Sequence, residues 1–240
     1  MGRKIAVINF NSYASGSSGN LYTVSDGHTT VMIECGLPWR RIKELLKYKT
    51  SEISGVICSH FHADHSKSFR EAAKAGIDIF ASKETFKTLD LSGHRLNEIS
   101  DGHQFTIGTW KILPFKTIHD VEGSLGFYMV NQEGEAFLYL TDSAYSLVRF
   151  KDLSVIAVEC NFISDILTAN ILSGGLPSVV GRRVRRSHFS LENVISLLKA
   201  NDLSKCREIH LLHLSDGNSD EQLMRQKVEA ATGIPTYPLK

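Results

Sequence analysis

The sequence predicts an α/β protein of the α+β type, in which two mixed β-sheets pack as a sandwich with helices outside. Apolar, β-branched segments of strand length recur along the chain, and each half is rich in strands first and helical afterwards. No linker, low-complexity run or short repeat separates the halves. Elements of this kind bury their apolar faces in packed layers. We therefore expect a single domain over residues 1–240, a length that is ample for a core.

The first half is expected to alternate between strands and helices. A flexible turn of small residues at 12–20 and a tight turn at 26–28 separate the first strands. Pro38 fits the preference of proline for the first turn of a helix. The expected strands are 5–10, 21–25, 29–35, 53–58 and 78–81, and the expected helices are 38–47, 66–74 and 83–89.

The second half is expected to continue strand after strand and to end in helices. Gly108, Gly123 and the turn at 131–134 divide the strands from one another. The last two helices have the apolar spacing of amphipathic helices. The expected strands are 105–107, 110–115, 125–130, 136–141, 153–159 and 208–214, and the expected helices are 190–200 and 220–231.

Composition and charge restrict the class of protein and of partner. Apolar residues make up 42% of the chain and charged residues 22%, which is ordinary for a soluble globular protein. The net charge of +1 favours a small substrate, because proteins that grip long nucleic acids usually carry a marked basic excess. The cysteines are scattered without CxxC spacing, as in a reduced, cytoplasmic protein. The apolar start is too short for a signal peptide or membrane span, so we expect no membrane association.

One short segment carries the densest group of candidate metal ligands. His60, His62, Asp64 and His65 stand within six residues, between the expected strand at 53–58 and the helix that follows. His60 and His62 are two residues apart and can point in one direction on an extended segment. Asp64 and His65 lie where the chain bends, so they can point to a second position nearby. Imidazole and carboxylate together suit zinc or a similar divalent ion.

Three further candidate ligands follow apolar strands. His119, Asp142 and His213 each stand where an expected strand ends. Any one of them alone could simply be a polar residue that meets solvent. The other histidines are less suitable, because three lie in polar turns and one lies inside a strand: His28, His94, His103 and His210.

The His-x-His-x-Asp-His pattern resembles the signature of the metallo-β-lactamase superfamily, and the resemblance extends along most of the chain. It implies an αββα sandwich and a site for two divalent ions, with zinc expected and manganese as the alternative. It further implies that the first metal is held by His60, His62 and His119, the second by Asp64, His65 and His213, and that Asp142 bridges both. Two adjacent metals can activate a shared water for hydrolysis.

A second resemblance concerns a catalytic pair. Segments 158–162 and 187–190 look like the two segments of the tRNase Z branch whose Glu and His contact each other, although Val158 departs from the first of these motifs. The resemblance implies that Glu159 orients His188, which can donate a proton to a leaving alkoxide. The alternative is a structural imidazole near a helix that Ser190 caps. With Asp64, these two are the candidate catalytic residues.

Candidate substrate-binding residues lie in two segments. The glycine- and serine-rich turn contains Ser17, Ser18 and Asn20, and its backbone N–H groups could bind an anion. The alternative is an ordinary loop. Arginines 182, 183, 185 and 186 form a basic run before His188, which is either a solvated face or a contact for phosphate. Of these, Arg186 is the expected substrate contact.

These features favour hydrolysis of a phosphodiester. The start of the chain resembles the WalJ/YycJ-type proteins, which are regarded as nucleases, and the final third resembles compact phage and Firmicute members, among them the anti-Pycsar proteins that degrade cyclic mononucleotides. Because the charge is near neutral and no RNA-gripping arm is evident between Asp142 and His188, 3′,5′-cyclic nucleotides are ranked first. A nuclease of the WalJ or tRNase Z type is the alternative, and a non-catalytic metal-binding scaffold is a further one. The resemblances also imply a homodimer, and a cytoplasmic location that would be the host cytoplasm for a phage-encoded protein.

Overall fold

The computed structural model describes residues 7–240. Its strands belong to two mixed β-sheets accompanied by helices, so the predicted fold class is confirmed. The chain divides into two compact units, which are described one at a time: Met1–Lys116 with Gly123–Ala136, and Thr117–Glu122 with Phe137–Lys240. No helix within residues 7–240 combines the length and the apolar character needed to cross a lipid bilayer.

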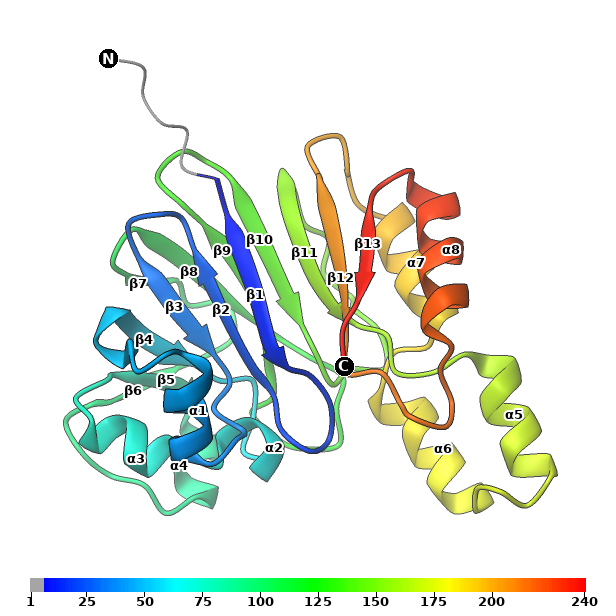
Figure 1. Ribbon diagram of the computed structural model, residues 1–240, viewed down its shortest axis with the longest axis horizontal. Helices are drawn as coiled ribbons and strands as arrows, with labels where there is room; N and C mark the ends of the chain where they lie inside the picture. Colours follow the sequence, from blue (N-terminus) through cyan, green and yellow to red (C-terminus); the bar gives the residue numbers. More distant parts are fainter. Residues whose placement is uncertain (1–6) are drawn as a thin grey trace. The chain divides into compact units, whose positions relative to one another are not determined.

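The first unit contains a complete six-stranded sheet (Figure 1). The strand order is β1-β2-β3-β4-β5-β6, antiparallel from β1 to β3 and parallel from β3 to β6. The strands are β1 (Asn9–Ala14), β2 (Leu21–Ser25), β3 (Thr30–Ile33), β4 (Ile53–Ile57), β5 (Ile79–Ser82) and β6 (Leu96–Ile99). The helices are α1 (Trp39–Leu45), α2 (Ala63–Ser66), α3 (Phe69–Lys74) and α4 (Lys83–Thr88), with a short 3₁₀ turn at Thr50–Glu52.

Helices α1, α3 and α4 pack on one face of this sheet (Figure 1). Ile42 of α1, Phe69 of α3 and Phe86 of α4 share a buried cluster with residues of β2 to β5. Each helix is too short to be stable alone in water, so burial of its apolar face supplies most of its stability. Strand β4 contributes Val56 to this cluster and leads directly into the segment of clustered histidines.

An antiparallel meander completes the first unit. It consists of β7 (Phe105–Ile107), β8 (Trp110–Lys116) and β9 (Leu125–Val130). Trp110 is fully buried, and its indole nitrogen donates a hydrogen bond to the Thr29 carbonyl over 3.1 Å. Beside it, Thr109 donates a hydrogen bond to the buried carboxylate of Asp26. These bonds attach the meander to the turn between β2 and β3.

The second unit is built on parallel strands. It contains β10 (Ala136–Leu140, of which all but the first residue belong to this unit), β11 (Leu153–Glu159), β12 (Glu208–Leu212) and β13 (Thr236–Pro238), in the order β13-β12-β11-β10. Strands β11, β12 and β13 are parallel. All seven residues of β11 are buried, as expected for a parallel strand that is covered on both faces.

Four helices belong to the second unit: α5 (Ser164–Leu172), α6 (Ser178–Ser187), α7 (Leu191–Lys199) and α8 (Glu221–Thr232). Ser190 caps α7 by accepting a hydrogen bond from the Asn193 amide, as the sequence predicts. Helices α7 and α8 pack on each other beside β12 and β13 (Figure 1).

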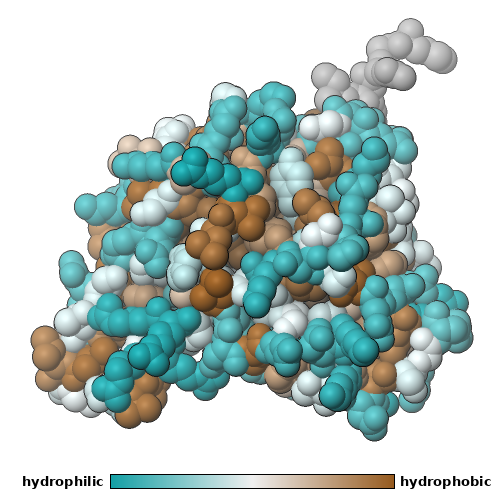
Figure 2. Space-filling view, turned by 180° about the vertical axis from the view of Figure 1, so that it is seen from behind, coloured by the Kyte–Doolittle hydropathy of each residue, from teal (hydrophilic) through white to brown (hydrophobic). Residues whose placement is uncertain are grey.

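Helices α5 and α6 form a hairpin that extends from the rest of the second unit (Figure 1). Gly181 of α6 is buried against Ile171 of α5, and a β-carbon at this position would lie 2.3 Å from the Ile171 Cδ1 atom. A larger residue here would therefore displace the Ile171 side chain. Figure 2 shows apolar side chains gathered at the end of this hairpin, next to hydrophilic ones. Leu172 and Val179 are the most exposed apolar residues there.

Most expected elements are confirmed, and the exceptions have local causes. The strands at 21–25, 105–107, 125–130 and 153–159 match β2, β7, β9 and β11. The expected turn at 12–20 is shorter, because β1 continues to Ala14 in antiparallel pairing with β2. Of the expected strand at 5–10, residues 5 and 6 lie outside the described residues. The expected helix at 66–74 is divided into α2 and α3, and β6, β13, α5 and α6 were not expected.

Candidate functional site

The first group of functional side chains stands in the loop after β4 and in α2, the short helix that follows it. We call it the loop cluster: His60, His62, Asp64 and His65. Strand β4 ends at Ile57, and α2 begins at Ala63, so the chain turns sharply where the cluster is placed. His60 and His65 are almost completely buried, whereas His62 and Asp64 are partly exposed.

The loop cluster is arranged as two pairs. His60 Nε2 lies 2.8 Å from His62 Nδ1, and His65 Nε2 lies 3.1 Å from Asp64 Oδ2. The ring centroids of His60 and His65 are 4.2 Å apart. The first two histidines therefore contact each other, and so do Asp64 and His65.

The fully buried carboxylate of Glu34 contacts the loop cluster. Glu34 follows β3 directly and adopts a left-handed backbone conformation, with φ of 63°. Its two carboxylate oxygens accept the Ser59 amide at 3.2 and 3.3 Å, and Oε1 lies 3.3 Å from His65 Nδ1. The Ser59 hydroxyl lies 2.9 Å from His60 Nδ1. Hydrogen bonds of this kind fix the orientation of ligand imidazoles.

Glu34 is not among the site residues expected from the sequence. The available signal was an acidic residue directly after an apolar strand, within the segment Ile33-Glu34-Cys35-Gly36. A charged side chain that follows a strand is usually solvated. Only the structure shows that this one is buried against the loop cluster.

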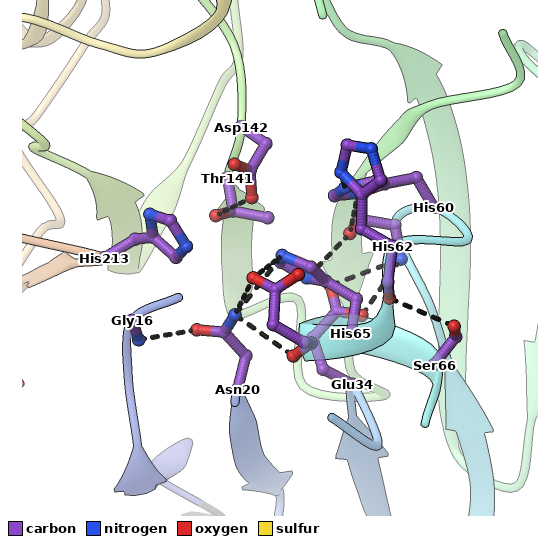
Figure 3. A network of polar contacts seen from close by, with 12 residues as sticks. Gly16, Asn20, Glu34, His60, His62, His65, Ser66, Thr141, Asp142 and His213 are labelled. Atoms are coloured by element: carbon purple, nitrogen blue, oxygen red, sulfur yellow. Dashed lines mark hydrogen bonds and ion pairs between the residues drawn. The ribbon is translucent and has the colours of Figure 1, made fainter. Parts of the chain in front are cut away.

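Asn20 holds the other side of the loop cluster (Figure 3). Its side-chain amide nitrogen donates to the Asp64 carbonyl over 3.2 Å and lies 3.2 Å from both Asp64 Oδ2 and His65 Nε2. Its oxygen accepts from the Gly16 amide at 2.9 Å and from the Tyr22 hydroxyl at 3.0 Å. Asn20 is therefore a positioning residue in the structure. The expected substrate contacts of Asn20, and of the exposed Ser17 and Ser18, stay predictions.

Backbone hydrogen bonds attach the loop cluster to the segments before β2 and after β3. The Asp64 carbonyl accepts the Asn20 amide at 2.8 Å, and the His65 carbonyl accepts the Cys35 amide at 2.7 Å. Gly36 lies between them, and a β-carbon there would come within 1.6 Å of the Asp64 carbonyl oxygen. No other residue allows the two backbones this approach without displacement.

The second group of functional side chains belongs to the second unit. We call it the strand-end cluster: Asp142, Glu159, His188 and His213. Glu159 is the last residue of β11, and His213 follows β12, whose Leu212 is in register with Glu159. Parallel strands end at the same edge of a sheet, which brings these two residues together. Asp142 follows β10 and His188 follows α6.

Backbone conformation helps to direct two of these side chains. Asp142 and His213 both have positive φ angles, 45° and 53°. The left-handed region is uncommon for residues other than glycine and is often found at functional sites. Each residue stands shortly after a strand. The left-handed conformation interrupts the alternation of side chains along that strand and so changes the direction of the side chain.

The strand-end cluster is tightly connected around Glu159. His188 Nδ1 donates to Glu159 Oε1 over 2.6 Å and lies 3.2 Å from Asp142 Oδ1. His213 Nδ1 lies 3.4 Å from the same Glu159 oxygen. One ligand atom from each of the four residues lies within 4.8 Å of one from every other. The contact between Glu159 and His188 that the resemblance implies is therefore present.

Charge and burial shift the protonation of this pair in opposite directions. Burial is the largest single cause and lowers the pKa of His188, but the Glu159 and Asp142 carboxylates together raise it by more, so the net pKa is raised. Burial is the largest single cause and raises the pKa of Glu159, but the adjacent His188 and His213 together lower it by more, so the net pKa is lowered and the ionised carboxylate is favoured. The pair therefore favours an imidazolium that is held in place by a carboxylate.

His119 and Asn161 lie close to the strand-end cluster within the second unit. The ring centroids of His119 and His188 are 5.9 Å apart, and His119 Nδ1 donates to the Ser187 carbonyl over 3.2 Å. Burial is the main cause of a lowered pKa at His119, which keeps its imidazole neutral. Asn161, which the sequence did not single out as a site residue, donates from its side chain to the His213 carbonyl at 2.8 Å.

The histidines that the sequence analysis excluded lie elsewhere. Those in polar turns, His28, His94 and His103, are exposed. His210 is buried within β12, and its ring stacks on Tyr237 with centroids 5.4 Å apart. Burial is the main cause of its lowered pKa.

Both clusters have the donor atoms that a divalent metal requires. Imidazole nitrogens and carboxylate oxygens converge in each, and buried Glu34 and Glu159 orient the imidazoles from behind. Such carboxylate–histidine contacts are typical of zinc sites. Manganese accepts the same mixed nitrogen and oxygen set. The residues therefore fit a divalent cation in each cluster.

Comparisons with known proteins agree with this arrangement. The family model described as Beta-lactamase superfamily domain matches residues 29–211. The exodeoxyribonuclease YycJ of Bacillus anthracis is 24% identical over 235 residues, which cover 92% of this chain and 88% of the relative. The exodeoxyribonuclease WalJ of Streptococcus pneumoniae is 26% identical over 244 residues, with the same coverage.

A solved structure extends the likeness to the fold. The metallo-β-lactamase fold protein YhfI from Bacillus subtilis superposes with a TM-score of 0.73 at 16% sequence identity. The match covers 98% of this chain and 97% of YhfI. The two chains therefore share their fold over nearly their full lengths.

Proposed function

Because this chain belongs to the β-lactamase superfamily, a family of metal-dependent hydrolases, we propose that it hydrolyses phosphodiester bonds in DNA. The observation that carries the proposal is the contact of His188 with Glu159 beside Asp142. A buried carboxylate that holds an imidazolium next to candidate metal ligands suits proton donation to a departing alkoxide.

We propose that both clusters contribute ligands to two divalent cations. As the sequence resemblance implies, His60, His62 and His119 are assigned to one cation, Asp64, His65 and His213 to the other, and Asp142 to both. Zinc is the expected metal and manganese the alternative. When bound, such a metal pair makes water nucleophilic near neutral pH and neutralises charge on the phosphoryl group.

The chain's own residues have separate roles in this proposal. Asp64 is assigned as a carboxylate ligand of one cation. His188 donates a proton to the leaving oxygen. Glu159 positions His188 and keeps it charged. Asp142 and Asp64 provide carboxylate oxygens, and oxygen ligands suit metals that work on phosphate.

The relatives favour DNA over the substrate ranked first from the sequence. The two curated relatives are named exodeoxyribonucleases and are matched over 92% of this chain. Cyclic 3′,5′-nucleotides are kept as the second candidate, because the net charge of +1 suits a small anionic substrate better than a long one. Self-association as a homodimer is a separate expectation, which the mass in solution would test.

One set of assays separates these candidates. The purified protein, loaded with zinc or with manganese, is incubated with linear single-stranded DNA, closed circular single-stranded DNA, RNA, and cyclic CMP, UMP and AMP. We expect nucleotides to be released from linear DNA while circular DNA stays intact, because an exonuclease needs a free end. Opening of the cyclic esters with intact polymers would support the second candidate, and no turnover at all would support a metal-binding scaffold.

Matched histidine variants connect the activity to the site. We expect His188→Ala to abolish most hydrolysis, whereas His94→Ala should leave it unchanged, because His94 is exposed and lies outside both clusters. Equal activity of the two variants would disprove the assigned role of His188.

A further inference from the structure

Helix α6 carries more positive charge than its own contacts neutralise. Its last turns contain Arg182, Arg183, Arg185 and Arg186. Arg183 Nε forms an ion pair with Asp120 Oδ2 at 2.8 Å, and Arg185 Nη2 donates to the Thr168 hydroxyl at 2.7 Å. Within residues 7–240, the side chains of Arg182 and Arg186 make neither a hydrogen bond nor an ion pair, and both are exposed.

The spacing of these two arginines places them on one side of the helix. Residues four apart in a helix are neighbours, with β-carbons about 5–6 Å apart, and like charges there repel each other. A favourable interaction of late basic residues with the helix dipole offsets part of this repulsion. A bound anion would remove the rest, and arginine binds phosphate in a bidentate way.

Arg182 and Arg186 line a hollow in the surface of the second unit. The hollow has a volume of about 340 Å³ and is also lined by Asp120, Val179, Arg183 and Ser187. We call it the arginine hollow. Its lining residues include three arginines and one aspartate, and that carboxylate is already paired with Arg183. Positively charged residues therefore outnumber negatively charged ones around the hollow.

The arginine hollow adjoins the strand-end cluster within the same unit. Asp120 follows His119 in the chain, and Ser187 precedes His188. The Ser187 carbonyl accepts the hydrogen bond from His119 Nδ1 at 3.2 Å. An anion in the hollow would therefore lie next to the residues that are assigned to the cleaved phosphate, but in a separate position.

We propose that the arginine hollow binds a second phosphate of the substrate, adjacent to the one that is cleaved. The proposal rests on the proposed phosphodiester hydrolysis at the strand-end cluster. A cyclic mononucleotide has a single phosphate and cannot fill both positions. The hollow therefore selects a polynucleotide strand, held by its backbone through Arg182 and Arg186, with Arg183 restrained by Asp120.

Substrates with one and with many phosphates test this selection. Bis(4-nitrophenyl) phosphate contains one phosphodiester, and a ten-residue oligothymidylate contains a row of them. For the Arg182→Ala/Arg186→Ala double variant, we expect kcat/KM on the oligothymidylate to fall about 10–100-fold, mainly through KM, because two charge-assisted contacts are lost. Hydrolysis of the one-phosphate ester should change less than twofold.

Arg185→Ala is the matched control for each single variant. It removes the same charge from the same helix, but its guanidinium contacts Thr168 and does not line the hollow. We expect Arg182→Ala to weaken the oligothymidylate reaction and Arg185→Ala to leave it unchanged. All three substitutions to alanine favour a helix, so the fold should be retained.

A binding measurement separates failure of this proposal from failure of the proposed function. Fluorescence anisotropy of a labelled oligothymidylate with metal-free protein needs no turnover. We expect the slope of log affinity against log salt to become less negative by about 0.7 for each arginine removed. Unchanged oligothymidylate affinity in the double variant would overturn the proposal even for an active nuclease. Weakened affinity in a protein with no hydrolytic activity would support the hollow and refute the nuclease.

Two outcomes of the kinetic assay would contradict the proposal. An equal loss on both substrates would place the arginines at the cleaved phosphate itself and overturn the second position. A loss of thermal stability without any dependence on substrate length would assign them to the helix dipole instead.

Discussion

The loop cluster and the strand-end cluster use the same kinds of side chain but are assembled in different ways. In the loop cluster, four candidate ligands occupy six consecutive positions, and the turn from β4 into α2 is enough to gather them. In the strand-end cluster, the residues come from separate elements and meet because β11 and β12 end at one edge.

Their supports differ in the same way. The loop cluster is held by side chains from other strands, Glu34 after β3 and Asn20 before β2. The strand-end cluster contains its own support, because Glu159 contacts both His188 and His213. A contiguous cluster needs outside groups to fix its orientation, whereas a dispersed one is fixed by the sheet that brings it together. Four predictions test this comparison, beginning with the largest expected effect.

The first prediction removes one imidazole from each cluster. We expect His60→Ala and His213→Ala each to lower the metal content from two ions to about one per chain. Activity should fall by about 10³-fold or more, because each metal supplies several kcal/mol of transition-state stabilisation. Elemental analysis by mass spectrometry, together with the DNA assay, measures both effects. Two ions retained in either variant would contradict the ligand assignment, and His94→Ala is the control.

The second prediction separates catalysis from metal binding in the strand-end cluster. We expect His188→Ala to lower kcat by about 10²–10⁴-fold, the usual contribution of a general acid. The metal content should stay at two ions. Glu159→Gln should lower kcat less, because the imidazole is retained but loses its charged partner. A variant of His188 that loses metal instead would show that this residue is a ligand.

The third prediction concerns the outside support of the loop cluster. We expect Glu34→Gln to weaken metal affinity about 10–100-fold, because an oriented contact with His65 and with the Ser59 amide is disturbed. Competition with a chelator of known affinity measures this change. Glu44→Gln is the matched control, since Glu44 forms only surface ion pairs with Arg40 and Arg41. Equal affinities for the two variants would exclude a positioning role for Glu34.

The fourth prediction uses a buried carboxylate outside both clusters. Asp26 accepts amide hydrogen bonds from His28 at 3.0 Å and Thr29 at 2.8 Å, and the hydroxyl of Thr109 donates to it. Burial alone would raise its pKa, but these hydrogen bonds lower it below the ordinary value of 3.8. We expect Asp26→Asn to reduce the free energy of unfolding by about 1 kcal/mol at pH 7 and to leave metal content and kcat unchanged.

The pH dependence of this effect has a definite sign. Since the folded pKa is below the unfolded one, the ionised carboxylate stabilises the fold above about pH 3.8 and loses this effect as the pH falls through the folded pKa. The difference between Asp26→Asn and the unaltered protein should therefore shrink below pH 3.8. Urea denaturation at several pH values measures it. A difference that grows toward acid pH would show that the sign is wrong.

Features that depend on residues close together in the chain could be predicted from the sequence, whereas features that depend on contacts between distant residues could not. Four strands were predicted with their observed ends, because alternation and turn residues are local signals. Helices α5 and α6 were not predicted, because much of their surface is exposed, α5 has a weak amphipathic periodicity, and α6 is highly polar. The role of Gly181 in the packing of these helices could not be inferred from the sequence, because it depends on Ile171 lying opposite.

The sequence by itself determined the fold class, the loop cluster and the pair of strand ends that His213 and Glu159 occupy. Covalent connection keeps six consecutive residues within one turn, so their convergence needs no further information. Only the tertiary structure decided that Glu34 is buried under His65, that Asn20 positions Asp64, and which arginines of α6 keep their charge unpaired. Those contacts depend on strand pairing and helix packing between distant segments, and side-chain burial follows from that packing.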